Sequence, residues 1–88
     1  MEKSFLSLLY EEAEIVNKME SIQNSLEFAV EKERRILEIP VECAMKAQDL
    51  NDTRLMVRAY TKDLETLKSA LATVREEMRE HLVMILST

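Results

Sequence analysis

The sequence predicts an all-α fold, an antiparallel hairpin of two long helices, and three observations lead to it. The 88 residues contain no glycine and one proline, so the turns that an all-β fold needs are missing. Hydrophobic residues make up 47% of the chain, which is too many for a disordered protein. They recur at steps of three and four, the spacing of one helix face rather than of a strand. A chain of this length holds one domain, residues 1–88.

The first helix is expected over about residues 4–38. Helical spacing continues from Phe5 without a break, and Pro40 ends it because the residue before a proline is pushed away from helical conformations. Acid–base pairs in the favoured order at i, i+4 support this helix, Glu14 with Lys18 and Glu31 with Arg35. Its apolar stripe consists of Phe5, Leu8, Leu9, Ile15, Val16, Met19, Ile22, Leu26, Ala29, Val30, Ile36 and Leu37.

The second helix is expected over about residues 52–86, after a turn at Pro40 and a short helical segment at about 41–50. Asn51 and Asp52 suit the N-cap of a new helix, which favours a break near them. One continuous helix through this region is the alternative. The second helix carries a heptad seam, formed by Val57, Tyr60, Leu64, Leu67, Leu71, Val74, Met78 and His81.

Two long helices joined by a short connection fold back antiparallel. A hairpin alone leaves much of each apolar stripe in water. A fold of this size with one layer of helices rarely buries enough apolar surface to be stable by itself. We therefore expect the chain to pair with itself, as a homodimeric four-helix bundle or coiled coil, or with another protein.

Both ends of the chain are too apolar for a single stripe, because five consecutive apolar residues point most of the way round a helix. In an antiparallel hairpin these ends meet at the open end, away from Pro40. An exposed apolar patch marks a contact surface. The expected partner-binding residues are Phe5, Leu6, Leu9, Tyr10, Leu82, Val83, Ile85 and Leu86. The predicted function is a non-enzymatic protein–protein interaction module, such as a small adaptor or secretion co-chaperone, that buries a partner's apolar helix surface.

The net charge and the lengths of the apolar segments limit which partners and which cellular location are expected. The net charge of −5 argues against general binding to nucleic acid or to anionic membranes. The longest apolar run, residues 82–86, is far shorter than the roughly 20 residues of a membrane span, and no secretory signal is visible. Cys43 is the single cysteine, so no disulfide forms within the chain. These features predict a cytoplasmic protein.

No catalytic residue, metal site, cofactor or small-molecule substrate is expected. One histidine and one cysteine cannot by themselves build a zinc site, and without glycine there is no phosphate-binding loop. The chain also lacks the Glu-x-x-His pattern of metal-binding bundles. We therefore predict that the protein is not an enzyme.

Two alternatives remain open. The acidic first half suits an inhibitor or nucleic-acid mimic that occupies a basic site, through Glu11, Glu12, Glu14, Glu20 and Glu27. A self-assembling structural subunit would use the open end as a head-to-tail contact. The cations Arg54, Arg58 and Lys62 share one helix face, and the simplest expectation is that they pair across the hairpin with Glu27, Glu31 and Glu38.

Overall fold

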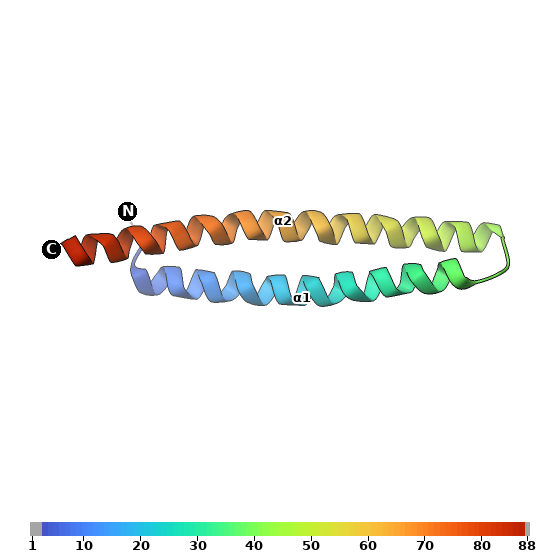
Figure 1. Ribbon diagram of the computed structural model, residues 1–88, viewed down its shortest axis with the longest axis horizontal. Helices are drawn as coiled ribbons and strands as arrows, with labels where there is room; N and C mark the ends of the chain where they lie inside the picture. Colours follow the sequence, from blue (N-terminus) through green and yellow to red (C-terminus); the bar gives the residue numbers. More distant parts are fainter. Residues whose placement is uncertain (1–2, 88) are drawn as a thin grey trace.

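The computed structural model describes residues 3–87 and consists of two long helices, α1 (Phe5–Glu38) and α2 (Ala44–Ser87). Figure 1 shows the helices side by side and antiparallel, with the connecting turn at one end of the rod and the start of α1 and the end of α2 at the other. The molecule measures 69 × 17 × 15 Å along its principal axes. The predicted all-α helical hairpin is therefore confirmed.

Helix α1 has clear signals at both ends. The hydroxyl of Ser4, the N-cap residue, accepts a hydrogen bond of 3.1 Å from the backbone N–H of Ser7. At the other end, Ile39 adopts an extended conformation with φ −66° and ψ 121°, as expected of a residue before proline. Its N–H still donates to the carbonyl of Ile36. The helix thus starts one residue later than the sequence predicted and ends at the predicted residue.

Helix α2 runs without interruption through the region where a second helix was expected to start. The helix begins at Ala44 rather than near residue 41. Residues 44–50 belong to the same helix as residues 52–86, so the favoured break is absent and the alternative of one continuous helix is confirmed. The physical reason is that Lys46, Leu50 and Thr53 continue the heptad steps of four and three that lead into Val57. Each of these side chains is buried or half-buried, and no glycine or proline falls between them.

The core is a narrow seam between the two helices. On α1 the inward residues follow steps of three and four from Phe5 to Ile36, with Glu12 and Glu33 among them. Thr53 is buried in the same seam, where its hydroxyl donates to the carbonyl of Asp49 at 2.7 Å. The buried apolar side chains are Leu8, Ala29, Ile36, Leu64, Leu71 and Val74.

Two ion pairs across the seam show the register in which the two helices pack. Nε of Arg75 donates to Oε2 of Glu12 at 3.1 Å, and Nε of Arg54 donates to Oε1 of Glu33 at 3.2 Å. The two glutamates lie 21 residues apart on α1, and the two arginines lie 21 residues apart on α2. Because 21 residues are three heptads, the helices stay in one antiparallel register between the two pairs.

Candidate interaction surfaces

At the open end a contact between two rings ties the helices together. The rings of Phe5 and His81 lie 6.3 Å apart between centroids at an interplanar angle of 62°, an edge-to-face arrangement. Both residues are half-buried, and Leu8 beside them in the seam is fully buried. Helix α2 then extends beyond the start of α1, as Figure 1 shows. Its last turn therefore lies past the first residue of the facing helix.

Apolar side chains are exposed around this end. We call the eight residues predicted to bind a partner the open-end surface. Phe5 packs inward against His81, whereas Leu6 is 60% exposed and Leu86 is 85% exposed. The other members of this surface are also exposed, namely Leu9, Tyr10, Leu82, Val83 and Ile85.

The structure shows exposed apolar residues beyond those predicted to bind a partner. Met84 is exposed among the members of the open-end surface on α2. A second exposed apolar group lies at the opposite end of the rod, formed by Leu37, Ile39, Val41 and Met45. The sequence signal that was available for this group is the run of apolar residues on both sides of Pro40.

The residues predicted for the seam of the second helix lie on the side of α2 that faces α1. Leu64, Leu71 and Val74 are buried. The remaining members are half-buried, namely Val57, Tyr60, Leu67, Met78 and His81. They pack only against α1 within the hairpin, which explains why most of them keep part of their surface in water.

The apolar stripe predicted for the first helix is split in the structure. Most of its members lie in the seam, but Leu9, Val16, Val30 and Leu37 are 40–51% exposed. These four residues lie at one side of the seam and are called the flank stripe below. The sequence pattern did not separate these four residues from the seam residues. An apolar residue next to a seam residue also fits the steps of three and four that define the stripe.

The three cations predicted to face acids across the hairpin behave differently from expectation. Arg54 does pair across it, but with Glu33 rather than with a predicted partner. The predicted partners Glu31 and Glu38 instead bind Arg34 on their own helix, because residues three and four apart are the nearest neighbours on a helix surface. The remaining predicted groups, Arg58, Lys62 and Glu27, are exposed.

Glu31 has the most strongly perturbed acid–base equilibrium of the described carboxyls. The side chain of Arg34 donates two hydrogen bonds to this carboxylate, Arg35 donates a third, and all three favour the charged form. They lower the pKa of Glu31 to about 2. The same pairing raises the pKa of Arg34. Glu31 and Arg35 line a small hollow on the surface of α1, together with Phe28 and Lys32.

The acids proposed for a nucleic-acid mimic do not form one continuous free surface. Glu12 is paired with Arg75, and Glu11 accepts a bond of 2.7 Å from Lys3, which raises the pKa of that lysine. Glu14 lies 3.5 Å from Lys18. Glu20 and Glu27 are exposed. Neutralisation within the hairpin therefore weakens the acidic field over the first turns of α1.

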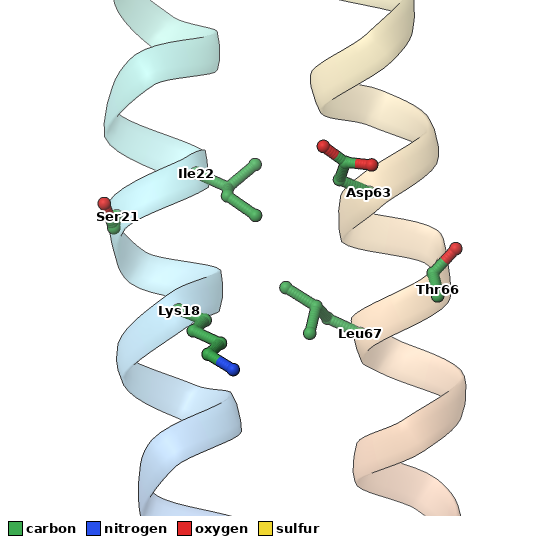
Figure 2. Close-up of a pocket in the computed structure, with 6 residues that line it drawn as sticks. All are labelled: Lys18, Ser21, Ile22, Asp63, Thr66 and Leu67. Carbon is green, nitrogen blue, oxygen red and sulfur yellow. The ribbon is translucent and has the colours of Figure 1, made fainter.

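A shallow hollow lies along one side of the seam, near the middle of the rod (Figure 2). Ile22 of α1 and Leu67 of α2 point toward each other between the helices. The polar side chains at its edges are Lys18, Ser21, Asp63 and Thr66. The hollow is open to solvent and carries one ammonium and one carboxylate group. It lacks the enclosed, converging charges that acid–base chemistry requires.

Within residues 3–87, no group of three or more histidine, cysteine, aspartate or glutamate side chains is placed to hold a metal ion. Over the same residues, neither helix has a stretch long and apolar enough to cross a membrane. Comparison of the chain with protein-family models, with curated proteins and with solved structures finds no match.

Proposed function

We propose that the hairpin is a protein–protein interaction module, of the adaptor or co-chaperone kind, that binds an apolar helix of a partner at its open-end surface. The observation that carries this proposal is the exposure of apolar side chains on both helices at the same end of the rod. Single exposed apolar residues are ordinary, but a contiguous group of them is typical of a contact surface.

The shape of this end favours a helical partner. Helix α2 continues past the start of α1, so its last turn has an apolar side without a facing helix. A partner helix lying there extends the seam by supplying side chains at i, i+3 and i+4. A shallow hollow on the neighbouring outer face of α2, lined by Val83 and Met84 together with charged residues, offers polar contacts at the rim.

The edge-to-face contact of Phe5 with His81 joins the two helices at the base of this surface. Because the two helix ends are held together there, the apolar groups of α1 and α2 stay in a fixed relative position. A pre-organised surface binds with a smaller loss of conformational entropy than a frayed end.

The test is retention of a partner by the immobilised hairpin from an extract of the cells that make it. We expect Leu86→Asp to abolish retention at both low and high salt, because a buried carboxylate opposes apolar docking. Leu55→Asp is the matched control, since Leu55 is 53% exposed on the outer side of the same helix.

The outcomes separate the candidate functions. Retention that survives high salt and is lost with Leu86→Asp alone supports the proposal. Retention that is unchanged by Leu86→Asp and disappears at high salt contradicts it and points to the acidic alternative.

A further inference from the structure

The flank stripe of α1 has a regular geometry that the open-end surface does not explain. Leu9, Val16, Val30 and Leu37 fall on one row with a seven-residue interval, and Gln23 occupies the remaining position. A seven-residue interval keeps a row aligned with the seam of a coiled coil. The row spans about 42 Å at 1.5 Å per residue. It is therefore a nearly full-length apolar edge beside the seam.

This row reads the same in both directions. Leucine lies 14 residues before and 14 residues after Gln23, and valine lies seven residues before and seven after it. In a two-fold symmetric antiparallel contact, residue i of one helix meets residue j of the other and residue j meets residue i, so a row that reads the same in both directions pairs like side chains. In an antiparallel contact centred on Gln23, leucine meets leucine and valine meets valine.

We propose that the flank stripe is the contact surface for a second copy of this chain, with the two α1 helices antiparallel and crossing the symmetry axis at Gln23. Leu9 of one copy packs against Leu37 of the other, and Val16 of one packs against Val30 of the other. The contact buries four partly exposed apolar side chains on each copy. It uses residues 9–37, shares Leu9 with the open-end surface, and leaves the last turn of α2 outside the stripe.

The polar residue at the centre specifies this alignment. Nε2 of Gln23 donates to Glu27 on its own helix at 3.3 Å. Its amide carries a second N–H and an oxygen, so two copies of Gln23 at the axis are able to hydrogen-bond to each other. A polar side chain within an apolar row fixes register, because any shift leaves it facing an apolar group.

The exposed area of the hairpin also matches the need for a second copy. The chain exposes 6900 Å², whereas a compact monomer of this mass exposes about 5,400 Å². The excess is comparable with the area that two contacts of ordinary size cover, each about 800 Å² per partner. One such contact along α1 therefore leaves area for the partner proposed at the open end.

The experiment uses charges at the two valine positions and measures molecular mass by sedimentation equilibrium. Val16→Lys and Val30→Glu each place a charge at two symmetric points, so we expect each variant to raise the dimer dissociation constant about 100-fold or more. Phe28→Glu is the control: Phe28 is 72% exposed on α1 but lies outside the stripe, and this variant should dimerise like the unchanged chain. Helicity by circular dichroism confirms that each variant is folded.

Combining the two charges tests the orientation. In the antiparallel contact, Val16→Lys of one copy meets Val30→Glu of the other, so the double variant and an equimolar mixture of the single variants should both recover the dimer. A parallel contact instead places like charges together in the double variant, and its failure to dimerise would overturn the proposal. An unchanged chain that stays monomeric at every concentration would also overturn it, as would dimers of Val16→Lys as tight as those of the unchanged chain.

These substitutions lie outside the open-end surface, so the two proposals fail separately. Leu86→Asp should leave the dimer intact, whereas Val16→Lys should leave retention of the partner through α2 intact.

Discussion

Glu12 and Glu33 occupy seam positions where an apolar side chain would bury more surface. Each is half-buried and ion-paired to an arginine from the edge of α2, so neither charge is left without compensation. Such pairs contribute little net stability, because desolvation offsets the attraction between the charges. Their effect is on register, since a shift of one helix by a few residues separates both carboxylates from their arginines. In the proposed dimer, Gln23 of the flank stripe likewise affects the register of the contact more than its stability.

Glu31 gives a prediction about pH. Its pKa is lowered to about 2 in the folded chain, against 4.5 as its ordinary value. A depressed carboxyl pKa contributes stability that is present above pH 4.5 and is lost as the pH falls through about 2. We expect Glu31→Gln to lower the free energy of unfolding at pH 7 by a small amount, because the site is on the surface. The difference from the unchanged chain should vanish near pH 2.

Urea denaturation at several pH values between 7 and 2 provides the measurement. Glu14→Gln is the control, since Glu14 lies in a longer ion pair of 3.5 Å. If the effect of Glu31→Gln were as large at pH 2 as at pH 7, the pairing with Arg34 and Arg35 would not be the source of the stabilisation.

The long helix α2 shows how a seam overrides a local capping signal. Asn51 and Asp52 are good N-cap residues, which favours a break in the helix at these positions. Burial of Leu50 and Thr53 against α1 requires continuous helical phase through the same residues. Because the side chains of Asn51 and Asp52 remain exposed, the helix accommodates them at the cost of their weak propensity alone.

Replacing these two residues distinguishes a cap from a helix interior. We expect Asn51→Ala and Asp52→Ala to raise the free energy of unfolding by up to about 0.5 kcal/mol each, because alanine is the better helix former. An N-cap would instead lose about 1 kcal/mol on the same substitution. The sign of the change in thermal denaturation midpoint decides between them, and a decrease would contradict the continuous helix.

The elements themselves could be predicted because the heptad spacing and Pro40 are local signals. The fold class and the limits of α1 followed from them. Which acid meets which arginine could not be predicted in the same way. Arg54 meets Glu33 rather than a neighbouring glutamate because the antiparallel register, set by the whole seam, brings these two together. The exposure of the flank stripe likewise depends on how far α2 covers α1, which the hydrophobic period does not specify.

Because the hairpin is elongated, side-by-side and head-to-tail assembly give particles of different length. One hairpin is 69 Å long, and two hairpins joined along α1 keep nearly the same length with a thicker cross-section. Head-to-tail contact through the open ends would instead lengthen the particle with every added copy. We expect small-angle X-ray scattering to give a maximum dimension near that of one hairpin at all concentrations. Growth of this dimension with concentration would support the structural-subunit alternative and contradict side-by-side pairing.

The same measurement checks the fold as a whole. The Cα radius of gyration of the hairpin is 19.7 Å, whereas a compact domain of this length has about 12 Å. A value near the smaller figure would mean that the helices fold back on themselves in solution.

The start of α1 and the end of α2 lie at the same end of the rod, and this has a mechanical consequence. A pulling force applied to the two ends acts across the seam rather than along it. The force therefore loads one layer of side chains at a time, beginning with the contact of Phe5 and His81 and moving toward Pro40. Layers that separate one after another resist far less than layers that must shear together. The hairpin is therefore expected to open one layer at a time under tension, and the partner proposed for the open-end surface would hold the first layer closed.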